Sequence, residues 1–200
     1  MYKQLIIARK DLNMSSGKLA AQVSHGSMAF LTSMIKANTQ KLMENQHPAW
    51  RYYGEERKPQ FYKRQDLNTW SQEARDRGED YFYARPVNPA LPYAEMELCE
   101  PTYIYRAQFD IDNDLYEQWI NGSFTKIVCE ARNRNQLLKA VTIAEELGLQ
   151  EGKDFFLIKD NCLTELQPEE TDGCTLTCIG FAPLPEDVVS KISKKYQLYK

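Results

Sequence analysis

The first thirty residues constrain the fold more than any other stretch of the chain. The apolar run KQLIIAR, residues 3–9, leads through the polar break KDLNMSSG into KLAAQVSHGSMAFL, residues 18–31. The run is typical of a buried strand, and the small and apolar residues after the break recur at helical spacing. The sequence therefore predicts a strand, a polar turn and a helix that begins on a lysine.

The turn and the start of this helix have the features of an anion site. Ser15 or Ser16 can cap the helix by accepting a hydrogen bond from a backbone N–H. Gly17 lets a ligand approach the turn closely, and Lys18 adds a full charge at the positive end of the helix dipole. Three polar residues at i, i+4 and i+7 share one stripe of the helix: Lys18, Gln22 and His25.

Two alternatives compete with a functional site in this stretch. A Walker-type phosphate loop requires a glycine where Leu12 stands and a serine or threonine where Leu19 stands, so that motif is not favoured. In a purely structural interpretation, Lys18 is a solvated first-turn residue and His25 is a hydrogen-bonded core histidine. This stretch alone leaves the choice open.

Length and composition exclude several classes of protein. The 200 residues suffice for one domain with a buried core and an appendage. No run is apolar enough to span a bilayer, and the N-terminus lacks a signal-peptide pattern, so we expect a cytoplasmic protein without a membrane partner. The five cysteines form an odd set without zinc spacing, from which we expect reduced thiols, no metal and no cofactor. With a formal net charge of −3, any nucleic-acid partner must be held by a local basic patch.

The middle of the chain lacks the regularity of its two ends. Residues 32–44 can continue the opening helix, but from 46 to about 113 aromatic and charged residues mix without a period and prolines recur. This predicts a single domain over residues 1–200 that is interrupted by an irregular inserted subdomain at about 46–113. Within the insert we expect a short helix at 68–77 and a strand at 103–109.

One segment of the insert, WRYYGEERKPQFYKR at 50–64, interleaves basic and aromatic side chains. Such side chains suit phosphates and stacked bases. Glu55 and Glu56 dilute the charge, which favours the alternative of a solvated surface over a small aromatic core.

Regular patterns return after Asp114. The expected elements are a turn at 115–119 ended by Gly122, a strand at Lys126–Ala131, a helix capped by Asn133 or Asn135 and running to Leu147, strands at 154–159 and Thr175–Phe181, and a last helix beginning at Pro185. Strands joined through helices pair in parallel with right-handed crossovers, whereas the last two strands lack a helix between them. We therefore predict an α/β fold, a three-layer α/β/α sandwich with a small mixed four-stranded sheet whose fourth strand is antiparallel.

This topology brings distant polar residues to one edge of the sheet. The carboxyl ends of parallel strands share an edge, where such folds bind ligands. The first strand delivers Lys18 there, the third delivers Asp160, and an antiparallel fourth strand starts there with Thr175. Thr164 lies in the loop between the last two. An ammonium, a carboxylate and two hydroxyls are therefore expected to converge.

These stretches resemble the type-2 peptidyl-tRNA hydrolases. The matching pieces are GKLAAQVSH, LYEQWINGSFTKIVCE, EELGL, FFLIKDNCLTEL and TLTCIGFAPLPEDVV, which cover most of the chain outside about 39–113. The chain departs from the family in its long insertion after the first helix and in a longer loop, EETDGC, before Thr175. The resemblance implies the same mixed sheet between helices, with peptidyl-tRNA as substrate.

The resemblance also implies roles for individual residues. The expected catalytic residues are Lys18, Asp160, Thr164 and Thr175, and the expected substrate-binding residues are Gln22, His25 and Gly17. Hydrolysis of the ester between peptide and ribose needs a positioned water, a proton acceptor and donors for an oxyanion. Asp160 can orient or deprotonate the water, Lys18 can stabilise the oxyanion or hold the terminal phosphate, and the threonines can position water or ribose.

Other functions remain compatible with the same residues. A nucleophilic pair of Cys162 and His25 is less favoured, because a thiol in a polar loop is more often incidental. The long insert motivates a non-enzymatic RNA- or protein-binding module on the same fold, or a hydrolase of another small ester. It also offers a contact for a homodimer.

Overall fold

The computed structural model describes residues 1–44, 60–63, 76, 81–86, 96–98 and 102–200. The chain forms two compact units, one made of Met1–Asn38 and Gln108–Lys200 and the other of Thr39–Ala107. The basic and aromatic segment at 50–64 lies outside the described residues except for Gln60–Lys63, as does the helix expected at 68–77 except for Asp76.

A mixed sheet forms the centre of the first unit. Its long strands are β1 (Tyr2–Arg9), β7 (Lys126–Ala131), β8 (Phe155–Asp160) and β9 (Thr175–Phe181), in the spatial order β7-β1-β9-β8. β7 pairs with β1 in parallel, and β9 runs antiparallel to both β1 and β8. Two short strands extend the sheet, β10 (Leu184–Pro185) beside β1 and β11 (Gln197–Leu198) beside β7. The predicted mixed sheet is confirmed, with its antiparallel strand in the interior.

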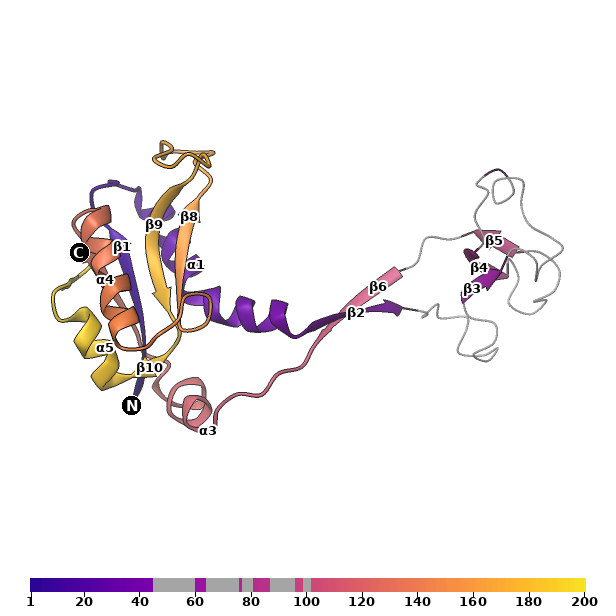
Figure 1. Cartoon of the computed structure of the whole chain (residues 1–200), viewed down its shortest axis with the longest axis horizontal. Helices are drawn as coiled ribbons and strands as arrows, with labels where there is room; N and C mark the ends of the chain where they lie inside the picture. The colour runs from indigo at the N-terminus through magenta and orange to yellow at the C-terminus, as the bar shows by residue number, and fades with distance from the viewer. Residues whose placement is uncertain (45–59, 64–75, 77–80, 87–95, 99–101) are drawn as a thin grey trace. The chain divides into compact units, whose positions relative to one another are not determined.

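Helices cover both faces of this sheet, as Figure 1 shows. α1 (Ser16–Ala37) lies on one face, and α4 (Arg134–Glu146) and α5 (Glu186–Ser193) lie on the other. Leu137, Ala144, Val189 and Ile192 from the α4–α5 side join the buried residues of the sheet in the larger core cluster. The α/β sandwich is thus confirmed, and Asn133 is the residue that caps α4.

α1 touches the sheet backbone directly at two glycines. A Cβ atom on Gly180 of β9 would lie 2.0 Å from the carbonyl oxygen of Gly26 in α1. A Cβ atom on Gly26 would lie 3.3 Å from Ile6 of β1. Only glycine at position 180 permits this approach, and a side chain at position 26 would require its neighbours to shift, so the two residues fix where the opening helix rests on the sheet.

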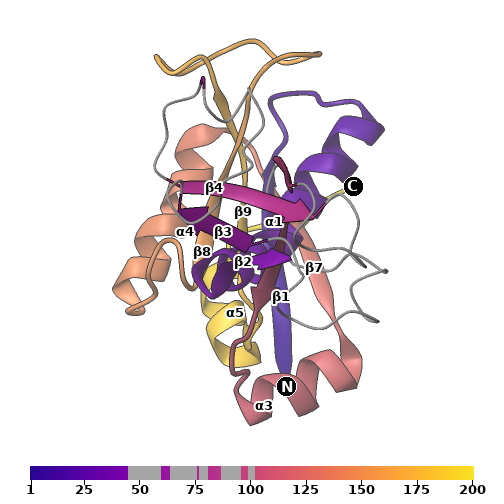
Figure 2. The same ribbon diagram turned by 90° about the vertical axis from the view of Figure 1, so that its right-hand side faces the viewer.

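A short helical segment returns the chain to the sheet. α3 (Asn113–Leu115) continues into the π-helix η4 (Tyr116–Ser123), beside the N-terminal end of β1 (Figure 2). Trp119 is buried, contacts Phe30 of α1 edge-on and donates a hydrogen bond from its indole to the Thr125 carbonyl. The helical backbone breaks at Gly122, where an end was expected. The hydrogen bonding of the element reaches Ser123, and Phe124, in the left-handed conformation, closes it by donating a bond to the Trp119 carbonyl.

The pairing of β8 with β9 contains a bulge. Ile158 pairs with Cys178 and Lys159 with Leu176, which leaves Thr177 as an extra residue of β9. Leu176 therefore joins the larger core on the α4–α5 face, whereas Thr177 and Cys178 both bond to Gln22 of α1. A bulge of this kind re-aims a side chain to the other face of a sheet.

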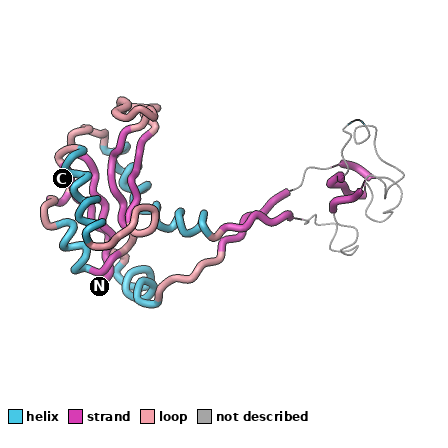
Figure 3. The backbone as a smooth tube through the Cα atoms, viewed as in Figure 1, coloured by secondary structure: helices cyan, strands magenta, loops and turns pink. Residues whose placement is uncertain are grey.

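The second unit contains the remaining strands (Figure 3). β2 (Thr39–Glu44) pairs antiparallel with β6 (Thr102–Ala107), and β3 (Gln60–Lys63), β4 (Tyr81–Pro86) and β5 (Met96–Leu98) form an antiparallel sheet in that order. The helix expected to continue through 32–44 is wrong beyond Ala37. Asn38 ends it with bonds to the last-turn carbonyls, and the following backbone pairs with β6 instead. The strand expected at 103–109 is found as β6.

Candidate active site

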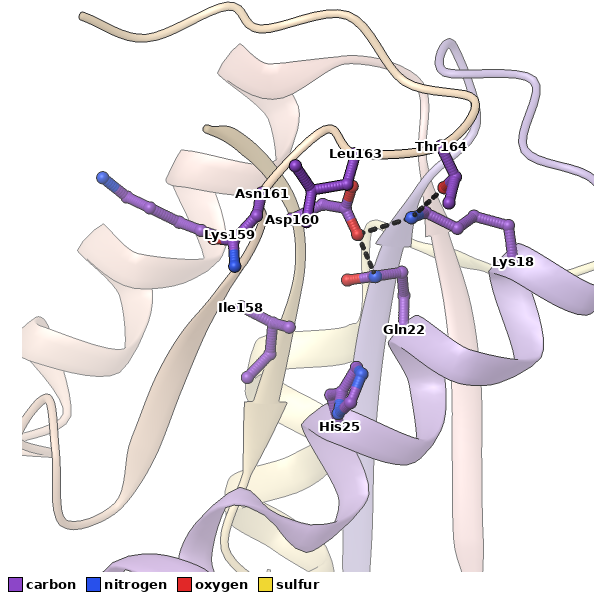
Figure 4. Close-up of a pocket in the computed structure, with 9 residues that line it drawn as sticks. All are labelled: Lys18, Gln22, His25, Ile158, Lys159, Asp160, Asn161, Leu163 and Thr164. Atoms are coloured by element: carbon purple, nitrogen blue, oxygen red, sulfur yellow. Dashed lines mark hydrogen bonds and ion pairs between the residues drawn. The ribbon is translucent and has the colours of Figure 1, made fainter. Parts of the chain in front are cut away.

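A pocket of about 390 Å³ opens at the carboxyl end of β8, beside the first turns of α1. It is lined by Lys18, Gln22 and His25 of α1, by Ile158, Lys159 and Asp160 of β8, and by Asn161, Leu163 and Thr164 of the loop that follows (Figure 4). The helical stripe and the strand end expected to meet at this edge do meet there. His25 is exposed, so it is not the core histidine of the structural alternative.

The centre of the pocket is an ion pair between Lys18 and Asp160. The Lys18 ammonium lies 2.6 Å from Oδ2 of Asp160, and the two side chains are 15% and 10% exposed. The Gln22 amide donates a hydrogen bond to the same oxygen at 2.7 Å, and the backbone N–H of Cys162 donates to Oδ1 at 2.9 Å. Figure 4 shows the lysine and glutamine side chains pointing together at the carboxylate.

This environment keeps the Asp160 carboxylate charged. Burial raises its pKa, but hydrogen bonds from Lys18, the Cys162 backbone and Gln22, together with the lysine charge, lower the pKa below its ordinary value. Asp160 is therefore ionised at neutral pH, and it is better suited to hold and orient a water molecule than to retain that molecule's proton.

Lys18 also ties the helix to the loop that follows β8. Its ammonium donates a second hydrogen bond to the Thr164 hydroxyl at 3.0 Å. Ser15 caps α1 by accepting a bond from the Lys18 backbone N–H, and its own N–H donates to Glu165 at 2.8 Å. An ammonium has three N–H donors, and within the described part of the chain two of them have protein acceptors. The third can serve a ligand.

Thr177 is a site residue that the sequence did not reveal. The bulge aims its hydroxyl at the α1 face, where it lies 2.6 Å from Oε1 of Gln22 and 3.0 Å from the Ile158 carbonyl. A hydroxyl that donates to Oε1 fixes the amide of Gln22 so that its NH₂ faces Asp160. Strict alternation of side chains along β9 would place Thr177 on the α4–α5 face of the sheet. The sequence near Thr177 contains no pattern that predicts the bulge, so the residue could not be assigned to the α1 face.

The predicted residues Thr175 and Gly17 are not among the residues that line the pocket. Thr175 is fully buried, donates its hydroxyl to the Gln167 carbonyl at 2.7 Å and accepts from the Glu169 backbone N–H at 3.0 Å. It lies opposite Asp160 in the β8–β9 register but holds the far end of the connecting loop. Gly17 is exposed in the first turn of α1. Cys162 points its thiol to the Asp160 carbonyl, and no bond joins it to His25 in the described part of the structure.

A second ionic cluster anchors the same loop behind the pocket. Arg9, the last residue of β1, is 2% exposed and directs all five of its N–H donors to protein oxygens. Two bonds go to Asp11, two to Glu169 and one to the Leu176 carbonyl. The arginine lowers the pKa of Glu169 through hydrogen bonding and charge. We call Arg9, Asp11 and Glu169 the loop clamp.

The described residues include neither a cluster suited to a metal ion nor a helix suited to a membrane. No group of three or more His, Cys, Asp or Glu side chains among them is arranged to hold a metal ion. None of the helices within the described ranges has the length and hydropathy needed to cross a membrane.

Comparisons with known proteins agree with the geometry. The family model described as "Peptidyl-tRNA hydrolase PTH2" matches residues 2–82 and 100–199. A peptidyl-tRNA hydrolase of Thermococcus sibiricus is 25% identical over 197 residues, covering 98% of this chain and 97% of the relative. One of Methanopyrus kandleri is 25% identical over 194 residues, covering 96% and 94%. One of Thermoplasma acidophilum is 26% identical over 88 residues, covering 44% and 68%. With its family model matched over most of its length, this chain belongs to the peptidyl-tRNA hydrolase PTH2 family.

Proposed function

We propose that this protein hydrolyses the ester bond of peptidyl-tRNA and releases peptide and free tRNA. The observation that carries the proposal is the Lys18–Asp160 pair, braced by Gln22 and Thr164 in an open pocket of a chain that belongs to this family. The relatives reported above bear the name of the same activity.

The ionised Asp160 is proposed to orient the attacking water. Its Oδ2 accepts from Lys18 and Gln22, whereas Oδ1 accepts only the Cys162 N–H among the described residues and so retains acceptor capacity. A water held there attacks the ester carbonyl carbon. The carbon–oxygen bond to the ribose then breaks, and the proton lost by the water passes to the ribose oxygen.

Lys18 is proposed to stabilise the oxyanion that forms during this attack. Its remaining N–H and its charge stand at the N-terminal end of α1, where the helix dipole adds to the positive potential. Preorganised donors of this kind act without reorganisation during the reaction. The Thr164 hydroxyl accepts from Lys18, and because no described residue accepts its own proton, that proton can go to a water or to the ribose.

Of the remaining predicted residues, His25 and Gly17 are proposed to bind substrate at the periphery of the pocket, whereas Thr175 and Gln22 are proposed to position other groups. His25 lies farther along the α1 stripe. Gly17 leaves the first turn open, since among the described residues no atom outside its own turn lies within 4 Å of the position of an added Cβ. Thr175 is proposed to act through the loop that it closes rather than on the substrate. Gln22, oriented by Thr177, holds the Asp160 carboxylate in place.

One assay tests this function. Purified protein is given an N-blocked aminoacyl-tRNA, a free aminoacyl-tRNA and a simple alkyl ester, and release of the acyl group is followed. We expect turnover of the blocked aminoacyl-tRNA well above that of the other two. Absence of turnover, or equal turnover of the simple ester, would exclude the proposal. We also propose a cytoplasmic location, where translation supplies the substrate, and a homodimer, which sedimentation tests.

A further inference from the structure

The β2–β6 ribbon of the second unit presents two tyrosines and a lysine on one face. The antiparallel register pairs Lys41 with Tyr105 and residue 43 with Tyr103, so these three side chains take the same side of the ribbon. The lysine ammonium lies 3.7 Å from the centre of the Tyr103 ring. We call Lys41, Tyr103 and Tyr105 the ribbon face.

The aromatic rings of this face are open to solvent. Tyr105 is 69% exposed and Tyr103 is 41% exposed, which makes Tyr105 one of the most exposed large apolar side chains of the described residues. Exposed tyrosines at alternate positions of a strand offer successive flat surfaces about 7 Å apart. Such spacing suits rings that stack on successive planar groups of a ligand.

The charge on the ribbon face is positive although the chain as a whole is acidic. In the pairing of β2 with β6, Thr39 and Ala107 occupy positions on the same side of the ribbon as Lys41. Gln40, Glu44 and Arg106 occupy the alternate positions, which belong to the other side. The face thus combines an ammonium with aromatic rings, and none of its register positions carries an acidic residue. A ligand with flat rings and negative charge complements it.

We propose that the ribbon face binds unpaired nucleotides of the tRNA substrate, with a base stacked on Tyr105 and a phosphate held by Lys41. The inference rests on the proposed function, which supplies an RNA ligand, and adds a second RNA contact in the unit that does not hold the pocket. Base stacking on aromatic side chains and phosphate contacts from lysine are the two interactions that hold single-stranded RNA without sequence preference. Because both units belong to one chain, a tRNA long enough to reach both is bound more tightly than by either unit alone.

The test compares tRNA affinity with turnover in the full chain. Affinity is measured by fluorescence anisotropy with a labelled deacylated tRNA, and turnover with an N-blocked aminoacyl ester of adenosine, which lacks the rest of the tRNA. Tyr105→Ala should weaken tRNA affinity about tenfold, or about 1.4 kcal/mol, whereas turnover of the minimal ester stays at the wild-type value. Tyr105→Phe keeps the ring and should bind as wild type. Tyr116→Ala removes a tyrosine of the first unit that is 46% exposed and is the matched control.

Lys41→Ala gives an independent readout. The affinity of this variant should depend less steeply on salt: the magnitude of the slope of log affinity against log salt should fall by about one, the value for one phosphate contact. Unchanged tRNA affinity in Tyr105→Ala, or an equal loss in Tyr105→Phe, overturns the ribbon face as a stacking site. If Tyr105→Ala changes the oligomeric state in solution and leaves tRNA affinity unchanged, the proposal is also overturned, because the ribbon face is then a contact between two copies of the chain. A different result is that the wild-type protein hydrolyses neither the adenosine ester nor N-blocked aminoacyl-tRNA while Tyr105→Ala still loses tRNA affinity. In that case the ribbon face stands and the proposed hydrolysis fails.

Discussion

Two ionic clusters stand at the same end of the first unit's sheet, and they differ in how fully their donors are used. The loop clamp buries Arg9 and satisfies all five of its N–H groups with carboxylates and a carbonyl. The pair of Lys18 and Asp160 opens into a pocket, and within the described residues it leaves a lysine donor and an aspartate lone pair for a ligand. A saturated cluster holds structure, whereas an unsaturated one in a cavity offers binding capacity.

The choice of cation in each cluster follows the same division. Arginine presents a planar fork that can satisfy two carboxylates at once, which suits a fixed buried joint. Lysine carries a compact charge with rotatable donors, which suits a group that must bond a partner and a ligand in turn. The loop of residues 161–174 lies between the clusters and is held by both, through Glu169 at one end and Thr164 at the other.

The largest expected effect is loss of turnover when the pocket pair is changed. Lys18→Ala and Asp160→Asn should each lower turnover of blocked aminoacyl-tRNA about 10²- to 10³-fold, the range for loss of a preorganised donor or carboxylate. Because both groups border an open pocket, we expect thermal midpoints close to wild type. Stopped assays and thermal melts measure the two quantities.

Lys159→Ala is the control for this pair. Lys159 also lines the pocket, but its side chain extends away from Asp160 in Figure 4 and pairs with Glu170 and Asp172. Its loss should leave turnover nearly unchanged. A Lys18→Ala protein that is fully active, or melts far below wild type, would show that the pocket pair is a structural joint like the clamp.

The second effect concerns the clamp and appears in stability. Arg9→Met leaves the two carboxylates without their cation and should lower the free energy of unfolding by about 2–3 kcal/mol, below the range for fully buried pairs because Asp11 and Glu169 are about one-third exposed. Urea unfolding measures this loss. Arg9→Lys restores the charge without the fork and should recover part of it. A stable Arg9→Met protein with a large loss of turnover would reverse the roles of the two clusters.

A third, smaller effect separates the two threonines of β9. Thr177→Val removes the bond that orients Gln22 and should lower turnover about tenfold, which equals about 1.4 kcal/mol in the barrier. Thr175→Val breaks the loop closure and should lower stability by about 1–2 kcal/mol, with a milder change in turnover. Serine at either position keeps the hydroxyl and is the matched control. The opposite pattern would place Thr175, as first predicted, nearer the chemistry.

The smallest effect is a difference in acid stability. The pKa values of Asp160 and Glu169 lie below the ordinary values of 3.8 and 4.5 in the folded protein. A depressed folded pKa contributes stability that is complete above the unfolded pKa and is lost as the pH falls through the folded value. Asp160→Asn and Glu169→Gln should therefore each flatten the decline in unfolding free energy below about pH 4.5, measured in urea across the acid range. If the unfolding free energy of either variant declines below about pH 4.5 as steeply as in wild type, the carboxylate replaced in that variant is not stabilised by its cluster.

The sequence predicted the parts of this site that depend on local spacing. Lys18 and Gln22 share a helical stripe, and Asp160 ends a strand, so periodicity and topology sufficed to bring them together. The loop clamp was not predictable in this way, because Arg9 and Glu169 are 160 positions apart and either could pair with many other charges. Thr177 was missed because a bulge depends on the pairing of two strands. The end of α1 at Ala37 was also missed, since the pairing of β2 with β6 overrides a helical pattern.

The bulge between β8 and β9 has a consequence for solubility. β8 is the edge strand of the sheet, so its outer side could template another extended chain, whether a neighbouring protein or the peptide of the substrate itself. A bulge adds local twist, and the charged Lys159 stands at the same point, beside its acidic partners on the loop. Both features discourage the addition of a further strand. The irregularity that aims Thr177 at Gln22 thus also protects this edge of the sheet against aggregation.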